Sequence, residues 1–117
     1  MKLLNRSGLS IRPCEPFTDW LSEFIQEVPP LESLRLEGML YLIDEVESEA
    51  DFDRALDAHW QTIFENELQA WDEFGDHWPS NLTRQQFDTW FDLDLQLMSF
   101  DLSDQALLRA PLSESNS

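Results

Sequence analysis

The chain has 117 residues, the length of one domain, and carries 24 acidic against seven basic side chains, for a formal net charge of −17. Binding to phosphates requires a basic surface, so we expect no direct contact with nucleic acid or with an anionic membrane. Hydrophobic residues make up 42% of the chain and aromatic residues 12%, including five Trp and eight Phe. This apolar content predicts a folded core rather than a disordered acidic chain.

Cys14 is the only cysteine, so the chain cannot form an intramolecular disulfide. Its neighbour Glu15 favours a raised thiol pKa, and we expect a structural or incidental role for Cys14. The longest apolar run, residues 39–43, is too short to span a bilayer, and residues 1–6 lack the apolar centre of a signal peptide. These features together predict a cytosolic protein.

The first half of the chain predicts strand, helix and strand. Residues 9–12 alternate apolar and polar side chains, which indicates a strand that ends at Pro13. A helix is expected from Pro16 until Pro29-Pro30 prevents its continuation, followed by a connector over residues 31–37. Residues 39–43 are apolar at every position, so we expect a strand covered on both faces in the middle of the sheet. The apolar face of the helix comprises Phe17, Trp20, Leu21, Phe24, Ile25 and Val28.

Two capping boxes divide the second half. Ser48 with Asp51 opens a long helix that we expect to end near Gly75, with His59 on its apolar face. Thr83 with Gln86 opens a short helix. Residues 91–97 then alternate apolar side chains with acids, which predicts a half-buried strand with an acidic outer face. From Met98 the apolar residues change parity, which indicates either a β-bulge or the end of regular pairing.

These elements predict an α+β fold with the order β-α-β-α-α-β, in which a three-stranded sheet packs against three helices. A right-handed crossover would make the first two strands parallel. We expect a single small domain over residues 1–110. Residues 111–117 have nothing to bury and are expected to form a disordered C-terminal tail.

Short segments along the whole chain resemble a family of short, acidic, uncharacterised proteobacterial proteins without assigned function. The segments are Leu4-Asn5-Arg6-Ser7, Arg12-Pro13, Pro16-Phe17, Asp19-Trp20-Leu21, Leu40-Tyr41-Leu42-Ile43, Ile63-Phe64-Glu65, Glu67-Leu68, Trp71, Trp78-Pro79, Phe87, Trp90-Phe91 and residues 98–102. Because they are mostly packing residues, the resemblance implies a shared fold and no catalytic site. The family is expected to favour a histidine where this chain has Gln96, which weakens the case for a metal or acid/base site on that strand.

The dominant chemical feature is the stretch of residues 37–76, which holds 13 acidic residues and one base, Arg54. Acids in the first turns of a helix complement its dipole, so those near Ser48 have a structural as well as a functional interpretation. Asp72, Glu73 and Asp76 lack that structural interpretation, because we place them at the C-terminal end of the same helix, where the dipole disfavours anions.

We therefore predict a docking surface for a basic protein partner. Trp71 and Trp78 are either core residues or aromatic anchors inside an acidic rim. The candidate partner-binding residues are Glu45, Glu47, Glu49, Asp53, Asp57, Glu65, Trp71, Asp72, Glu73, Asp76 and Trp78.

Several alternatives remain open at this point. The sequence has no Gly-rich phosphate loop, nucleophile elbow, HExxH or CxxC motif, and we expect no catalysis, cofactor or metal. A carboxylate-based, metal-dependent enzyme would use Asp92 and Asp94, or the turn of residues 72–77. Within the binding class, the protein would be a nucleic-acid mimic or an immunity-type inhibitor of a nucleic-acid-binding protein. A homodimer that buries Trp71, Trp78 or the third strand is the remaining option.

Overall fold

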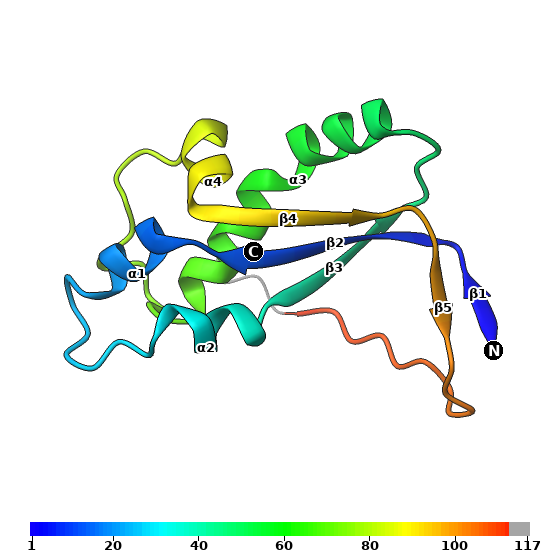
Figure 1. Ribbon diagram of the computed structural model, residues 1–117, viewed down its shortest axis with the longest axis horizontal. Helices are drawn as coiled ribbons and strands as arrows, with labels where there is room; N and C mark the ends of the chain where they lie inside the picture. The colour runs from blue at the N-terminus through cyan, green and yellow to red at the C-terminus, as the bar shows by residue number, and fades with distance from the viewer. Residues whose placement is uncertain (113–117) are drawn as a thin grey trace.

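The strand β2 (Arg6–Pro13) lies at the centre of the fold. It pairs antiparallel with β3 (Met39–Asp44) on one side and with β4 (Phe91–Gln96) on the other, which gives a three-stranded sheet. Figure 1 shows this arrangement in a computed structural model that describes residues 1–112. Side chains of a strand alternate between its two faces, and Ser7, Leu9 and Ile11 on one face of β2 are completely buried.

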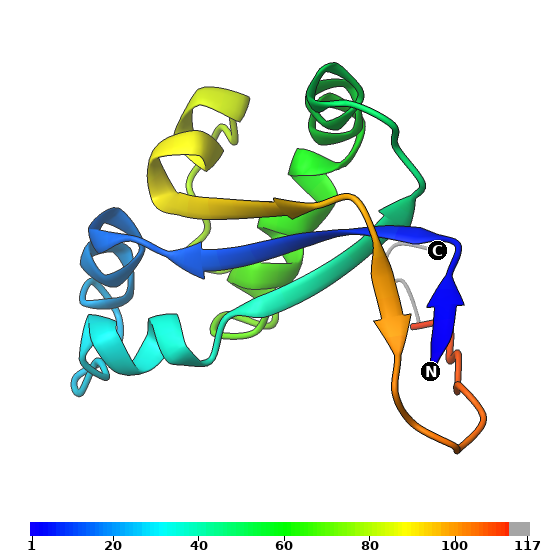
Figure 2. The same ribbon diagram turned by 45° about the vertical axis from the view of Figure 1, so that its right-hand side comes forward.

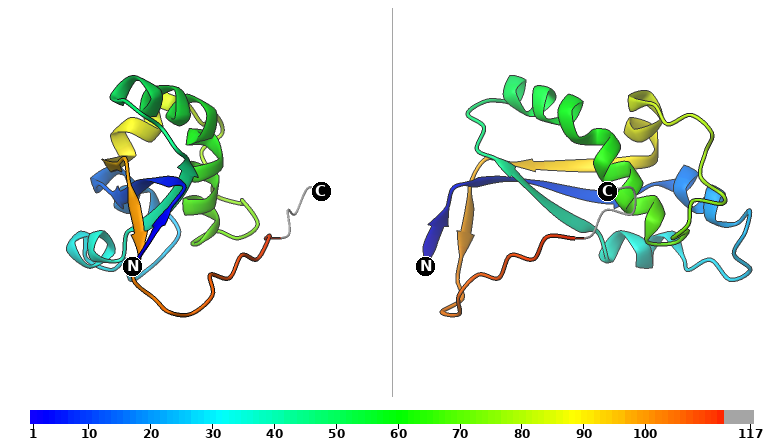
Figure 3. Two further views of the ribbon diagram at one scale, coloured as in Figure 1. Left: turned by 90° about the vertical axis from the view of Figure 1, so that its right-hand side faces the viewer. Right: turned by 180° about the vertical axis from the view of Figure 1, so that it is seen from behind.

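Two helices cover the buried face of the sheet, α3 (Glu49–Gln69) and α4 (Arg84–Trp90), as both views of Figure 3 show. Phe64 of α3 packs against Phe87 of α4 and Phe91 of β4, with ring centroids 5.8 and 5.6 Å apart. All three rings are buried, and the aromatic contacts join both helices to the sheet.

The remaining elements lie at the two ends of the sheet (Figure 1). At one end, α1 (Glu15–Leu21) and α2 (Leu31–Leu36) add Phe17, Trp20, Leu21 and Leu34 to the core. At the other end, β1 (Lys2–Leu4) and β5 (Ser99–Asp101) form a separate two-stranded antiparallel sheet. The predicted α+β class and three-stranded sheet are confirmed, with four helices instead of three among the described residues.

Both predicted helix N-caps are confirmed. The Ser48 hydroxyl accepts a hydrogen bond from the Asp51 backbone N–H at 3.3 Å, and the Thr83 hydroxyl accepts one from the Gln86 N–H at 3.1 Å. The carboxylate of Asp51 in turn accepts the Glu47 N–H at 3.2 Å, which is the main reason that its pKa is lowered. The two hydroxyl contacts satisfy amides that a helix leaves without partners at its start.

The predicted order and direction of the first two strands were wrong. β2 is the middle strand, and β3 lies at an edge with Leu40 and Leu42 exposed. The two strands are antiparallel because α1 and α2 stay at the Pro13 end of β2, so the chain returns to the sheet where it left. Gly38 permits this return, since a Cβ there would lie 2.6 Å from the Ile11 carbonyl oxygen.

The helix predicted from Pro16 to Val28 ends earlier, at Leu21. Beyond it, Phe24 packs against Trp20 and stacks on the ring of His77 at 4.5 Å, so tertiary contacts replace the helical continuation. Residues 31–36, which we expected in a connector, form the short helix α2 instead. Pro30 precedes this helix and its carbonyl accepts the first backbone hydrogen bonds.

Three further expectations are settled by the packing. The apolar change of parity at Met98 marks the end of pairing with β2, because the chain leaves β4 at Gln96 and turns into β5. His59 is exposed on α3 instead of buried. α3 ends at Gln69, and Gly75 adopts its positive φ of 77° in the following turn, so it does not cap the helix.

The predicted disorder of the tail falls mainly on residues 113–117, which lie outside the described residues. Within residues 1–112, no helix has both the length and the apolar character needed to cross a membrane.

The buried Ser7 side chain provides a test of this fold. Its hydroxyl donates to the Leu97 carbonyl at 2.8 Å and accepts the Val46 N–H at 3.0 Å, so it connects β2 to the segments that follow β4 and β3. Ser7→Ala leaves two buried backbone groups without partners and should lower the free energy of unfolding by about 1–3 kcal/mol in urea denaturation. Ser10→Ala, on the opposite face of β2, is the control and should change it much less. Equal losses for the two variants would contradict the predicted importance of Ser7.

Candidate functional site

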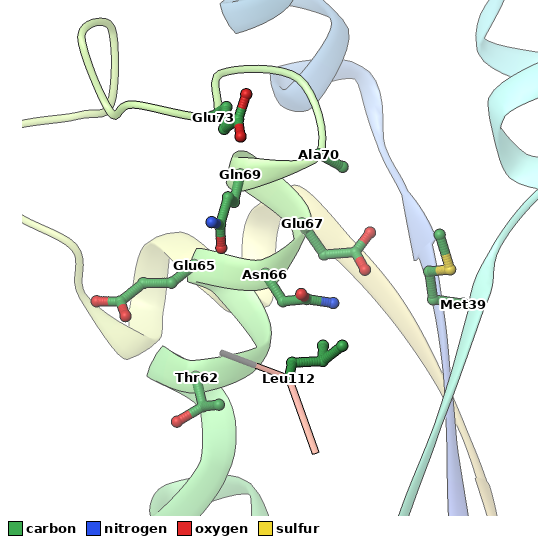
Figure 4. A pocket seen from close by; sticks show the side chains of 9 residues that line it. All are labelled: Met39, Thr62, Glu65, Asn66, Glu67, Gln69, Ala70, Glu73 and Leu112. Carbon is green, nitrogen blue, oxygen red and sulfur yellow. The ribbon is translucent and has the colours of Figure 1, made fainter. Parts of the chain in front are cut away.

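A groove with acidic side chains runs beside the C-terminal half of α3. It consists of two adjoining hollows of about 670 and 270 Å³, which share Met39, Glu67 and Ala70. We call it the acidic groove; Figure 4 shows the larger hollow. Its remaining lining residues are Thr62, Glu65, Asn66, Gln69, Glu73 and Leu112 in the larger hollow, and Pro13, Phe17, Leu34, Glu37, Gly38 and Trp71 in the smaller one.

Four carboxylates line the groove. Glu65 and Glu67 project from different sides of α3, and Glu73 lies on the turn beyond the helix (Figure 4). Glu37 lines the smaller hollow and directly follows α2. Apolar side chains line the same smaller hollow, with Trp71 half-buried and Phe17 and Leu34 buried. The groove therefore offers negative charge beside apolar surface, as the aliphatic stem and charged head of a lysine or arginine require.

Glu67 is the carboxylate most firmly held. The Tyr41 hydroxyl on β3 donates a hydrogen bond to the Glu67 carboxylate, and the Asn66 amide donates one to the Tyr41 oxygen at 2.8 Å. Burial raises the pKa of Glu67, an effect that the Tyr41 hydrogen bond only partly offsets. The pKa of Tyr41 is also raised, mainly by burial and in addition by the hydrogen bond with Glu67. The pair fixes β3 to α3, and Glu67 lines both hollows of the groove.

The groove contains three of the residues proposed from the sequence, Glu65, Trp71 and Glu73. Glu45, Glu47 and Glu49 are exposed near the start of α3. A helix of 21 residues spans about 30 Å, so these acids form a separate group far from the groove. The predicted surface is thus divided between the two ends of α3.

Asp53 and Asp57 have an intramolecular partner. Both form ion pairs with Arg84 of α4, which also pairs with Asp88 at 3.0 Å. Among the described residues, Arg12, Arg35 and Arg54 likewise pair with Asp94, Asp92 and Asp51. All four arginines between residues 7 and 97 are therefore already paired with acids.

The interpretation of Asp72 as an acid without a local structural role was wrong. Asp72 lies beyond the end of α3, is only 8% exposed, and its carboxylate accepts the His77 backbone N–H at 2.6 Å. Trp78 is half-buried against the core, and its indole N–H donates to the Asp72 carbonyl at 3.1 Å. Both side chains hold the turn after α3 in shape. Glu73 and Asp76 remain exposed in that turn.

Sequence reasoning missed that Met39 and Glu67 line the groove and that the Tyr41 hydroxyl holds Glu67. Glu67 precedes Trp71 by four residues, a spacing that places two side chains on one side of a helix, so its association with Trp71 could have been proposed. The contact between Glu67 and Tyr41 joins residues 26 positions apart and depends on the position of β3, which the sequence did not reveal.

Within residues 1–112, no three His, Cys, Asp or Glu side chains are close enough together to hold a metal ion. Asp92 and Asp94 each bind an arginine, at 2.9 Å in both cases. The Arg35 contact lowers the pKa of Asp92, while burial and the nearby Asp92 raise the pKa of the Cys14 thiol. A raised pKa keeps the thiol protonated, which makes it a poor nucleophile.

Comparisons with protein-family models, curated proteins and solved structures found no match to this chain.

Glu67 allows a test of the groove by pH. Its raised pKa means that the folded protein holds this proton more tightly than the unfolded chain does. The corresponding stabilisation is complete below the ordinary pKa of 4.5 and is lost as the pH rises through the raised value. Glu67→Gln keeps an acceptor for Tyr41 without the charge, so it should raise the melting temperature at pH 7 and change it little at acidic pH.

The control for this pH series is Glu23→Gln, which removes an exposed carboxylate outside the groove. At pH 7, Glu23→Gln should raise the melting temperature by much less than Glu67→Gln does. A Glu67→Gln protein that is less stable than the unaltered protein at pH 7 would contradict the burial of the Glu67 charge.

Proposed function

We propose that this protein is a non-enzymatic interaction module that binds a basic protein partner, and that the acidic groove receives a lysine or arginine side chain of that partner. The observation that carries the proposal is that four carboxylates line two adjoining hollows, the smaller of which also has apolar walls. A partner's aliphatic stem would contact Trp71 and Met39, while the carboxylates of Glu65 and Glu73 would attract its cationic head. We expect this interaction to take place in the cytosol.

The distribution of ion pairs supports a basic partner. Residues 7–97 contain 21 acidic side chains, and in the described structure only six of them pair with arginine. The other fifteen include all four groove carboxylates. They give residues 7–97, which we call the body, a strongly negative electrostatic field. Such a field accelerates the encounter with a cationic partner and opposes anionic ones.

A nucleic-acid mimic fits the geometry less well. A mimic needs free carboxylates at regular intervals, and Glu49, Asp53 and Asp57 follow one another at four-residue spacing on α3. Two of these three are bound by Arg84, so that row is partly neutralised by the protein itself. The groove acids, by contrast, have no arginine partner among the described residues, which is why we place the interaction there.

A titration with tetralysine, followed by ¹H–¹⁵N NMR, tests the proposal. We expect the largest amide shifts around the acidic groove, near Glu65, Ala70 and Trp71, and weaker binding at higher salt because the attraction is electrostatic. A double variant with Glu65→Gln and Glu73→Gln should weaken binding by about threefold to tenfold, as expected for two solvent-accessible ion pairs. Tetraglutamate should produce no such shifts.

The matched control is a double variant with Glu15→Gln and Glu23→Gln, which removes the same charge from exposed positions outside the groove. If both double variants weaken tetralysine binding equally, the attraction comes from total charge and the groove is not the binding site. Shifts centred on residues 45–49 would likewise reject the groove and favour the other end of α3.

A further inference from the structure

The two-stranded sheet of β1 and β5 projects from the body of the protein. In Figure 2 it extends at a steep angle from the end of the main sheet, and the views in Figure 3 agree. Its register pairs Lys2 with Asp101, Leu3 with Phe100 and Leu4 with Ser99. We refer to residues 1–6 and 98–104, which comprise these strands and their immediate neighbours, as the ribbon.

One face of the ribbon is apolar and uncovered. Leu3 and Phe100 are directly opposite each other, so their side chains share a face. Met1, Met98 and Leu102 directly precede or follow the two strands along the chain and add to the apolar surface at the ribbon. All five side chains are at least half exposed. On the other face, Leu4 and Ser99 are half-buried, and the Ser99 hydroxyl donates to the Arg6 carbonyl at 2.9 Å.

The ribbon has little to stabilise it within one molecule. It contains three residue pairs from strands 97 positions apart in the chain, as the pairing of Leu3 with Phe100 shows. An isolated two-stranded sheet is marginally stable in water, and a contiguous apolar surface is typical of an interaction site. A partner that covers the face on which Leu3 and Phe100 lie would therefore stabilise the pairing of the two strands.

The charge distribution identifies what can cover this face. Residues 7–97 hold 21 acidic and four basic side chains, so the full net charge of −17 lies in the body. In the ribbon, Lys2 and Arg6 balance Asp101 and Asp104, which leaves no formal net charge. A strongly basic partner would be attracted to the body, and an anionic membrane would be repelled by it. A second copy can approach through the neutral, projecting ribbon with the least repulsion.

We propose that two copies of this chain associate through the apolar faces of their ribbons. A two-fold axis would place Leu3 and Phe100 of one copy against the same residues of the other, which closes the assembly at a dimer. The projection of the ribbon keeps the two acidic bodies apart, and at physiological ionic strength charges are screened over about 8 Å. Association should accordingly strengthen as salt is added.

Sedimentation equilibrium over a concentration series up to about 1 mM tests this proposal. The mean mass of the unaltered protein should rise from 13.8 kDa toward twice that value and no further. Phe100→Ser should weaken the association by about tenfold or more, because a central aromatic residue commonly dominates an interface. Phe74→Ser, at an exposed phenylalanine in the turn after α3, is the matched control and should leave the dimer unchanged.

A second measurement needs no variant. ¹H–¹⁵N NMR spectra of the unaltered protein at low and high concentration should differ only for residues in and next to the ribbon. This measurement decides the matter if Phe100→Ser fails to fold. A mass of 13.8 kDa at every concentration, equal weakening by both substitutions, unlimited growth beyond a dimer, or concentration-dependent shifts centred on the body would each overturn the proposal.

Discussion

Repulsion among like charges is the constraint on which the rest of this structure depends. The body holds all of the net charge of −17, and a compact fold brings these carboxylates closer together than an extended chain does. The free energy gained by burying the core must exceed the free energy of this repulsion. The buried aromatic contacts among Phe64, Phe87 and Phe91 are at the centre of that core. Placing nearly all of the acids at the surface leaves them hydrated and available to a cationic partner. The same excess explains why the neutral ribbon is the surface through which two copies can meet.

Three of the four arginines in the body join elements that lie far apart in the sequence, while Arg54 pairs with Asp51 in the same helix. Arg84 of α4 holds acids of α3, Arg12 joins β2 to β4, and Arg35 joins α2 to β4. Exposed ion pairs contribute at most about 1 kcal/mol each, so they relieve local repulsion more than they stabilise the fold. Burial of Asp72 and Glu67 follows a different rule, because each side chain has hydrogen-bond partners inside the protein. The structure thus separates acids with an internal role from acids left for a partner.

Features encoded in neighbouring residues could be predicted from the sequence. The N-caps at Ser48 and Thr83, the strand at residues 9–12 and the acidic outer face of β4 depend on local patterns and are confirmed. Strand order could not be predicted, because it depends on α1 and α2 remaining at one end of the sheet. The groove was only partly foreseen, since Glu65, Trp71 and Glu73 meet Met39 through the position of β3. The role of Asp72 could not be predicted, because only the turn after α3 brings its partner, the His77 backbone N–H, within hydrogen-bond distance.

Thermal unfolding at pH 7 as a function of sodium chloride tests the central role of repulsion most directly. Between about 0.01 and 0.15 M salt, the Debye length falls from about 30 Å to about 8 Å, which screens surface charges from one another. If repulsion among the surplus carboxylates opposes folding, the melting temperature should rise over this range. A melting temperature that stays constant or falls would show that repulsion among the carboxylates does not oppose folding.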